Sequence, residues 1–299
     1  MSGPRWIAAD WGTSNLRAWS MEGDRAVAEA TSERGMGTLA PEEFEDALMA
    51  LVVDWLDGPT TAVICGMAGS RQGWAEAPYA RVPCAPAQPG AATRVKTGDP
   101  RLDVHILPGL KQTEPADVMR GEETQIAGFL ETHPGWDGVL CLPGTHSKWA
   151  HVSAGEVVSF RTFMTGELFA LLSGQSVLRH ALGGSGWDEA AFDAAVERAL
   201  SRPVALTSDL FGLRAEGLVH GLDAGTARAR LSGLLIGAEL AAARPYWLGQ
   251  QVAIVGAAGL SAHYARALEA QGIIAETADA EEMTLAGLIA ARHALEETA

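Results

Sequence analysis

The strongest constraint on the fold is a pattern that occurs twice along the chain. A short apolar run, a turn containing Gly-Thr and a second strand-like run begin near residue 7, and the same order returns 132 residues later. The shift aligns Trp11-Gly12-Thr13 with Pro143-Gly144-Thr145, and the apolar run 7–10 with 139–142. Similarity at a fixed spacing indicates a duplicated structural unit. We therefore predict two similar domains, residues 1–134 and 135–299, with a cleft between them.

The segments around these copies alternate between strand-like and helix-like patterns, which is typical of an α/β architecture. Apolar residues have helical spacing over 41–56 and 121–130, and residues 61–65 read as a buried strand. Residues 78–100 are rich in Pro, Ala and Gly and predict a loop. Beyond residue 186 the patterns are mostly helical, with a strand at 251–255. The closing helix, over 284–294, is a candidate to pack back on the first domain.

The charge balance excludes a general polyanion binder. The formal net charge is −15, with 22 Lys and Arg against 37 Asp and Glu. Phosphate backbones are held by clustered basic residues, so nucleic acid is not an expected partner. Only three of the cations are lysines, and two of them, Lys111 and Lys148, lie in motif segments described below.

The cysteines and the apolar runs indicate a protein of a reducing compartment. The three cysteines form no CxxC pair, so neither a disulfide framework nor a cysteine-rich zinc site is expected. No apolar run approaches ~20 residues, and the N-terminus lacks a signal-peptide pattern. We expect a cytoplasmic protein without a membrane partner, and a homodimer stays open.

The first copy of the repeat, Asp10-Trp11-Gly12-Thr13-Ser14-Asn15, has the residues of an anion-binding turn. Its backbone N–H groups and small hydroxyls suit an anion, and Mg²⁺ is usually held by one or two carboxylates plus substrate phosphates. Asp10 is therefore a candidate magnesium ligand, and a plain hairpin with an acidic corner is the alternative. In the second copy Leu142 stands in the place of Asp10, which predicts one metal ligand and two phosphate loops.

Two adjacent acids, Glu122 and Glu123, follow Gly121 at an expected helix start. Paired carboxylates raise one another's pKa, and one of them could accept the proton of an attacking hydroxyl. Acidic capping of an amphipathic helix explains the same residues. The sequence does not rank the two acids.

Three further segments could contact ligands. The glycine-rich run 66–74 lacks the Gly-Lys-Ser/Thr of a P-loop and is a candidate substrate loop, in which Arg71 could hold a carboxylate. Residues 161–167 resemble it more weakly. Residues 255–259 follow a strand and precede a helix, which suits nucleotide contact, whereas the GxGxxG spacing of a Rossmann site is missing.

Taken in order, these motifs resemble those of the 2-dehydro-3-deoxygalactonokinases, within the actin-like ATPase superfamily. The residues that carry the resemblance are DWGTSN at 10–15, GMAGSRQGW at 66–74, LPGLKQ at 107–112, DVMRGEETQ at 117–125, LPGTHSKW at 142–149, RTFMTGE at 161–167 and VGAAGL at 255–260. The resemblance implies two duplicated actin-like (ribonuclease H-like) domains with ATP and Mg²⁺ in the cleft between them. It also implies phosphorylation of the 6-hydroxyl of 2-dehydro-3-deoxy-D-galactonate in galactonate breakdown.

The resemblance also implies roles for individual residues. Asp10 would hold the metal, and Asp10, Glu122 and Glu123 would form the catalytic group. The expected ATP-binding residues are Gly12, Thr13, Ser14, Asn15, Gly144, Thr145, His146, Ser147, Gly256, Ala257 and Gly259. The expected substrate-binding residues are Gly69, Ser70, Arg71, Gln72, Lys111, Lys148, Arg161 and Thr165.

Three rival functions remain open. An exopolyphosphatase-type phosphohydrolase also pairs an acidic turn with a glycine and two acids, but a polyphosphate chain would need a broad basic groove. The sequence also does not distinguish a kinase of the epimeric 2-dehydro-3-deoxygluconate, because a few contacts in the cleft read the configuration of one hydroxyl. A non-catalytic sugar-binding regulator would share the fold, and such proteins generally carry an added DNA-binding helix-turn-helix that this sequence does not show.

Overall fold

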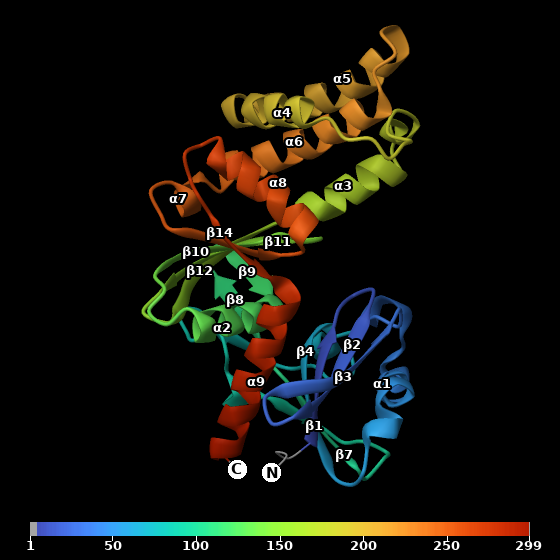
Figure 1. Ribbon diagram of the computed structural model, residues 1–299, viewed down its shortest axis with the longest axis vertical. Coiled ribbons are helices and arrows are strands. Elements are labelled where there is room, and N and C mark those ends of the chain that lie inside the picture. The colour runs from blue at the N-terminus through green and yellow to red at the C-terminus, as the bar shows by residue number, and fades with distance from the viewer. Residues whose placement is uncertain (1–4, 299) are drawn as a thin grey trace. The chain divides into compact units, whose positions relative to one another are not determined.

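A computed structural model describes residues 5–298 of the chain, which contacts divide into two compact units. Unit 1 contains the residues up to 137, 152–160 and those from 278 on; unit 2 contains 138–151 and 161–277. The first change of unit lies close to the predicted boundary at 134/135. The chain returns to unit 1 for residues 152–160 and again for its last helix, α9 (Ala280–Thr298), drawn in red in Figure 1.

Unit 1 is built on a six-stranded sheet with the order β3-β2-β1-β4-β7-β6. Its strands are β1 (Arg5–Trp11), β2 (Leu16–Glu22), β3 (Arg25–Ser32), β4 (Thr60–Gly66), β6 (Thr93–Val95) and β7 (Leu102–Ile106). The first three form an antiparallel meander, whereas β1, β4 and β7 are parallel. The carboxyl ends of β1 and β4 therefore lie side by side at one end of the strands, where the turn at residues 10–15 begins.

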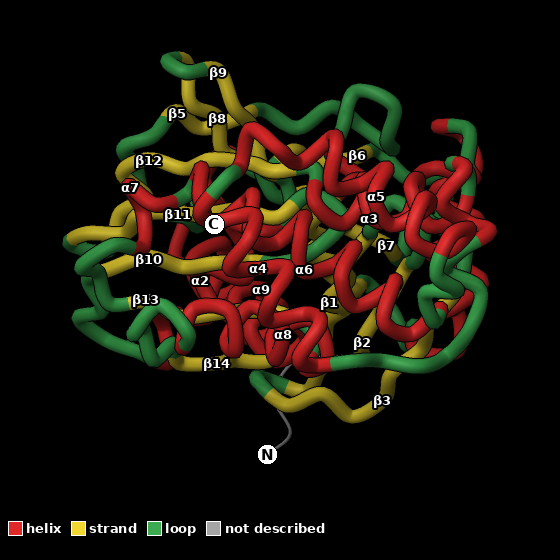
Figure 2. The backbone as a smooth tube through the Cα atoms, turned by 90° about the horizontal axis from the view of Figure 1, so that it is seen from above, coloured by secondary structure: helices red, strands yellow, loops and turns green. Residues whose placement is uncertain are grey.

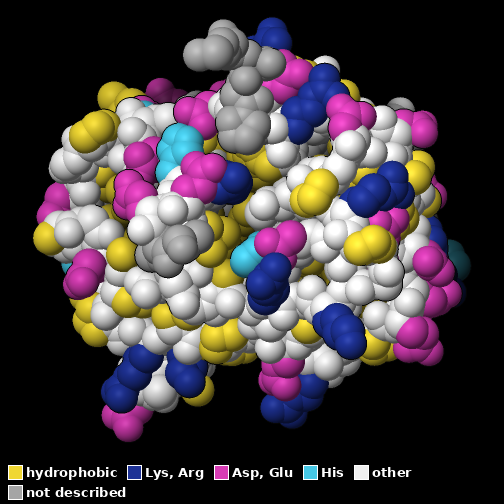
Figure 3. Space-filling model, turned by 90° about the horizontal axis from the view of Figure 1, so that it is seen from below, with side chains coloured by type: hydrophobic (Ala, Val, Ile, Leu, Met, Phe, Trp, Pro, Cys, Tyr) yellow, Lys and Arg dark blue, Asp and Glu magenta, His cyan; other side chains and the backbone are white. Residues whose placement is uncertain are grey.

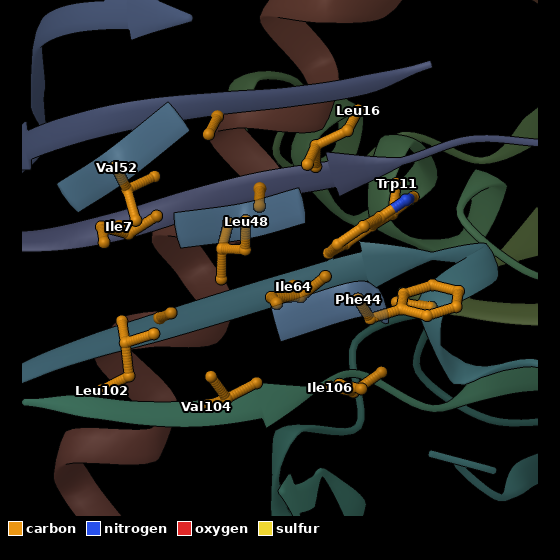
Figure 4. Packing of buried hydrophobic residues seen from close by; sticks show 14 of the residues in the cluster. Ile7, Trp11, Leu16, Phe44, Leu48, Val52, Ile64, Leu102, Val104 and Ile106 are labelled. Carbon is orange, nitrogen blue, oxygen red and sulfur yellow. The ribbon is translucent and has the colours of Figure 1, made fainter. Parts of the chain in front are cut away.

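Helices cover both faces of this sheet, and its central strands are therefore buried on both sides. On one face, α1 (Phe44–Val52) packs Phe44 and Leu48 against Trp11 and Ile64 (Figure 4). On the other face, α9 packs against β1 and β4 and also against α2 (Glu122–Thr132). The α2–α9 crossing is close, since a Cβ on Gly128 would lie 1.9 Å from the Met283 carbonyl oxygen.

A small three-stranded sheet, β5-β8-β9, also belongs to unit 1. Its strands are β5 (Tyr79–Arg81), β8 (Gly109–Thr113) and β9 (Ala116–Met119). The prediction of a loop over 78–100 was wrong at both ends, because β5 and β6 form there. Both are three-residue strands that pair at the edges of sheets, and such short segments leave little periodicity in a sequence.

The second large sheet has the order β12-β11-β10-β13-β14, which Figure 2 shows as five successive strands. They are β10 (Gly138–Leu142), β11 (Ser147–Ser153), β12 (Glu156–Phe163), β13 (Val252–Gly256) and β14 (Glu276–Asp279). The order matches β3-β2-β1-β4-β7 of the first sheet, and β10 runs parallel to β13 as β1 does to β4. The α/β class is confirmed, and the sequence repeat corresponds to this shared strand order.

The helices of unit 2 gather around one long buried helix, α6 (Ala224–Ala242). The others are α3 (Thr165–Gly174), α4 (Glu189–Ser201), α5 (Leu206–Val219), α7 (Arg244–Trp247) and α8 (Ala258–Glu269). Gly233 and Gly237 on α6 let α4 approach closely, because a Cβ at either position would meet the α4 backbone. Within residues 5–298, no helix combines the length and the apolar character needed to cross a membrane.

Candidate active site

In unit 1 the ends of β1 and β4 meet the first turn of α2. Gly66 ends β4 with φ +86°, and Gly121 precedes α2 with φ +103°. A Cβ on Gly121 would lie 3.4 Å from the Cα of Gly66. The two glycines therefore let the acidic start of α2 approach the carboxyl ends of the strands.

Asp10 lies in this corner, as the second-to-last residue of strand β1 before the loop. Its Oδ1 atom accepts a hydrogen bond from the Cys65 thiol at 3.6 Å. Burial raises the pKa of Asp10, the Cys65 thiol and Arg17 lower it, and the Glu122 charge raises it again. Burial, Asp10 and Glu123 together raise the pKa of Cys65, so this thiol stays protonated and can donate to Asp10.

The two acids of α2 have different surroundings. Glu123 is 2% exposed, and both of its carboxyl oxygens accept from the Gly121 N–H at 2.8 Å. Burial and the neighbouring Glu122 raise the pKa of Glu123 to about 8. Glu122 is only half-buried, and its Oε2 accepts from the Arg120 N–H at 3.1 Å. Of the two, only Glu122 is open to a substrate.

The raised pKa of Glu123 predicts that stability falls as the pH rises. Between its ordinary pKa of 4.5 and about 8, the folded protein keeps a proton that the unfolded chain has released. The linkage slope is then negative and amounts to about 1.4 kcal/mol per pH unit for this group. We expect Glu123→Gln to remove that slope, so that its advantage over the wild type grows from pH 5 to pH 7.5. Urea unfolding in metal-free buffer measures this, and parallel pH profiles would contradict it.

The turn after Asp10 is braced from one side by residues 35–37. Gly12 N–H donates to the Asn15 carbonyl at 2.8 Å, and Gly37 N–H donates to the Thr13 carbonyl at 2.8 Å. A Cβ on Gly35 would lie 2.2 Å from the Ser14 carbonyl carbon. Thr13, Ser14 and Asn15 are exposed. The loop is therefore fixed by its backbone and presents its polar groups outward, as an anion site requires.

The residues of this corner fit Mg²⁺. No group of three or more His, Cys, Asp or Glu side chains within residues 5–298 is arranged as a metal site. A single carboxylate is nevertheless enough for Mg²⁺ when phosphates and water supply the other oxygens. Asp10 offers such a carboxylate in a place where burial disfavours its negative charge, and a cation there would offset that cost.

Two arginines near the glycine-rich segment after β4, Arg71 and Arg120, differ in their exposure to solvent. Arg71 has a side chain that is 80% exposed and pairs with Glu76 at 3.5 Å, and Gln72 is also exposed. Arg120 is 9% exposed, and its guanidinium lies 4.2 Å from the centre of the Tyr79 ring. Its Nη2 donates to the Ala77 carbonyl at 2.8 Å. The positive charge of Arg120 is thus buried inside unit 1, beside the segment that contains Gly69 and Ser70.

In unit 2 the second copy of the turn lies between β10 and β11. Gly144 is half-buried, whereas Thr145 and His146 are exposed. The imidazole Nε2 of His146 lies 2.6 Å from Glu167 Oε2. Ser147 is fully buried, and its hydroxyl hydrogen-bonds to the Tyr264 hydroxyl at 3.0 Å. The side chain of Ser147 therefore braces the loop from the core, whereas residues 144–146 remain accessible to solvent.

A cavity of about 530 Å³ opens beside this turn, entirely within unit 2. Its wall includes Gly144 and Thr145 from the turn, Thr165 and Gly166 from α3, and Gly259 from α8. The structure thus brings residues of two expected ATP motifs together around one cavity. Thr165, which was expected to bind the substrate, lies in the same wall. Among the other expected residues, Ala257 is exposed near the start of α8, and Gly256 is buried against the Ser261 hydroxyl.

The aromatic wall of this cavity was not foreseen from the sequence. Trp187 and His263 stack with ring centres 4.3 Å apart, and Arg228 lies over the Phe169 ring at 5.1 Å. Flat aromatic surfaces suit the face of a nucleobase. These residues come from four separate segments, so no local pattern connected them. A single Trp between helices was their only signal.

The remaining expected substrate residues are spread over the two units. Lys111 is exposed on β8 of unit 1, and Arg161 is exposed on β12 in unit 2. Lys148 is 5% exposed on β11, and its Nζ donates to the His146 carbonyl at 3.0 Å. Within unit 1, the structure brings together Asp10, Cys65, Gly66 and the two acids of α2. Cys65 had no motif to mark it.

Comparison with known proteins gives one consistent result. The family model described as 2-keto-3-deoxy-galactonokinase matches residues 10–291. A protein named "Probable 2-dehydro-3-deoxygalactonokinase DgoK1" from Rhizobium meliloti (strain 1021) is 42% identical, over 97% of both chains. The 2-dehydro-3-deoxygalactonokinase of Escherichia coli (strain K12) is 36% identical, over 97% of this chain and 98% of its own.

Solved structures agree on the fold. A crystal structure from Sinorhizobium meliloti, named as a putative 2-dehydro-3-deoxygalactonokinase, has a TM-score of 0.88 at 41% identity. It covers 97% of this chain and 99% of its own. The activator of a 2-hydroxyisocaproyl-CoA dehydratase from Clostridium difficile, with bound ADPNP, has a TM-score of 0.55 at 11% identity, covering 99% and 97%. The second likeness concerns the fold alone.

Proposed function

The chain belongs to the 2-keto-3-deoxy-galactonokinase family and is a sugar-acid kinase of the actin-like fold, and we propose how its residues carry out this reaction. Membership of this kinase family implies that ATP is the phosphoryl donor. The proposed acceptor is the 6-hydroxyl of 2-dehydro-3-deoxy-D-galactonate, in galactonate catabolism. The acceptor oxygen forms a bond to the γ-phosphorus, the bond from that phosphorus to the bridging oxygen breaks, and ADP leaves.

The observation that carries this proposal is the corner formed by Asp10, Gly66 and the start of α2. It combines a carboxylate beside a braced anion-binding turn with a second carboxylate that is open to a ligand. Phosphoryl transfer is catalysed mainly by positioning and charge neutralisation, so these groups match what the reaction needs. Asp10 would hold Mg²⁺, which when bound would neutralise charge on the phosphates.

Glu122 is the proposed base that accepts the proton of the attacking hydroxyl. Its half-buried carboxylate lies close enough to Asp10 to raise the pKa of that residue. Glu123 is 2% exposed and is held by the Gly121 N–H, so its proposed role is to fix the start of α2. This assignment rests on access, because a base must reach the hydroxyl from which it takes the proton.

The cavity of unit 2 is the proposed place of the nucleotide. Gly144 and Thr145 would face its phosphates, and Gly259 lies at the start of α8, where helix N–H groups favour negative charge. The stacked Trp187 and His263 would lie against the base. Arg120, buried in unit 1, supports a site for an anionic substrate there, together with the exposed Arg71 and Lys111 of the same unit.

The polyphosphatase alternative finds less support. A polyphosphate chain would need a continuous basic groove. On the described part of the face drawn in Figure 3, Lys and Arg side chains lie among Asp and Glu side chains without forming such a groove. The net charge of −15 points the same way.

A coupled ADP-release assay tests the proposed function. The protein is given Mg-ATP with 2-dehydro-3-deoxy-D-galactonate, with its gluconate epimer, or with no acceptor. We expect ADP release to depend on the galactonate-derived acid and to exceed that with the epimer by roughly tenfold or more, because a site that hydrogen-bonds a hydroxyl discriminates by its configuration. Release that is equally fast without any acid would instead favour a hydrolase.

A further inference from the structure

A buried carboxylate that no motif includes joins several elements around the cavity of unit 2. Glu239, on α6, is 2% exposed and lies in the apolar core of this unit. It accepts hydrogen bonds from Trp149 Nε1 at 2.8 Å, from the Tyr264 hydroxyl at 2.8 Å and from the Thr165 hydroxyl. The three donors belong to β11, α8 and α3, so one carboxylate links four elements.

Two of these donors also hold the turn at 144–147. The Tyr264 hydroxyl is hydrogen-bonded to Ser147 at the end of the turn. Thr165 starts α3, whose next residue, Gly166, is packed so closely that a Cβ there would lie 2.2 Å from the Gly144 carbonyl oxygen. Glu167 N–H donates to the Thr145 carbonyl at 2.9 Å. Tyr264 thus connects Glu239 to Ser147 at one end of the turn. The first turn of α3, which begins with Thr165, connects Glu239 to Gly144 at the other end.

Stability alone does not explain why this buried position of α6 is occupied by a glutamate. Burying a carboxylate costs free energy, and well-packed apolar residues commonly serve a core as well or better. A fully satisfied polar network, in contrast, fixes one arrangement of the elements that it joins. Thr165 and Tyr264 line the cavity, so the arrangement fixed here includes the cavity wall.

We propose that Glu239 is a positioning residue for the nucleotide, which holds the turn at 144–147 in register with the α3 and α8 walls of the cavity. This inference rests on the proposed nucleotide site in unit 2. Glu239 acts through Thr165, Tyr264 and Trp149, and the turn then meets the phosphates with its backbone already in place. Small displacements of positioning groups carry large kinetic costs.

The test compares two Trp→Phe variants in the same core. Trp149 donates to Glu239 at 2.8 Å, and Trp247 donates to the Leu240 carbonyl at 2.8 Å; both are nearly inaccessible to solvent. Each variant loses one indole N–H and a similar volume. We expect Glu239→Gln and Trp149→Phe to weaken binding of ADP and of a non-hydrolysable ATP analogue, measured by calorimetry, by roughly tenfold. Trp247→Phe should bind both as the wild type does.

Kinetics supply a second readout. The KM for ATP should rise in Glu239→Gln and Trp149→Phe, while the KM for the sugar acid stays unchanged. Should Glu239→Gln fail to fold, Tyr264→Phe removes the hydroxyl that links Ser147 to Glu239 and keeps the ring, with the same expected loss. The proposal is wrong if these variants bind nucleotide no worse than Trp247→Phe. A wild type that binds ADP but turns over no sugar acid would instead contradict the proposed function.

Discussion

Asp10→Asn is expected to lower kcat by roughly 10³-fold or more while the protein stays folded. Asp10 is held by the strand pairing of β1 with β2 and β4, which does not depend on its charge. Burial raises the pKa of Asp10, so its negative charge is less favourable there than in an exposed carboxylate. The amide keeps the shape and can still accept from the Cys65 thiol. Turnover at saturating Mg-ATP and thermal unfolding measure the two effects separately.

The unfolding temperature of Asp10→Asn should equal or exceed that of the wild type, because the buried charge is gone. Asp103→Asn is a matched control on β7 of the same sheet, where Asp103 pairs with Arg94 at 2.6 Å near the surface. It should keep full activity and change the free energy of unfolding by less than about 1 kcal/mol. Normal turnover in a folded Asp10→Asn protein would exclude a metal role for this carboxylate.

Glu122→Gln is expected to lower kcat by about 10²- to 10⁴-fold, the usual contribution of a general base. The half-buried Glu122 is open to a ligand, and the amide that replaces it cannot accept the hydroxyl proton. Substrate binding should change little, so the KM values for ATP and for the sugar acid should stay close to those of the wild type. Steady-state kinetics with ATP and with the sugar acid as varied substrate measure both effects.

Glu123→Gln is the matched variant one residue away. Its side chain is 2% exposed, so the substitution should leave kcat within about tenfold of the wild type and act mainly on stability. If Glu123→Gln loses turnover while Glu122→Gln keeps it, the two roles are exchanged. The sequence alone could not rank these acids, because adjacent residues of one motif differ only in which way the helix turns them.

Much of the architecture could be predicted because it depends on local patterns. The helical spacing over 121–130 corresponds to α2, and the apolar run at 251–255 corresponds to β13. The repeated turn corresponds to the matched ends of β1 and β10. In contrast, α5 and the small β5-β8-β9 sheet were missed. α5 buries only Leu213 within its length, so its apolar spacing carries little signal.

Spacing along the chain was enough to predict the duplicated α/β plan, the two glycine-containing turns and the pair of acids after Gly121. Which side chains contact each other depends instead on the tertiary structure. It brought Cys65 to Asp10 over 55 positions and Tyr264 to Ser147 over 117. It also buried Glu239 and Glu123 while leaving Glu122 open. Burial and hydrogen bonds between distant residues set these environments, and no local periodicity records them.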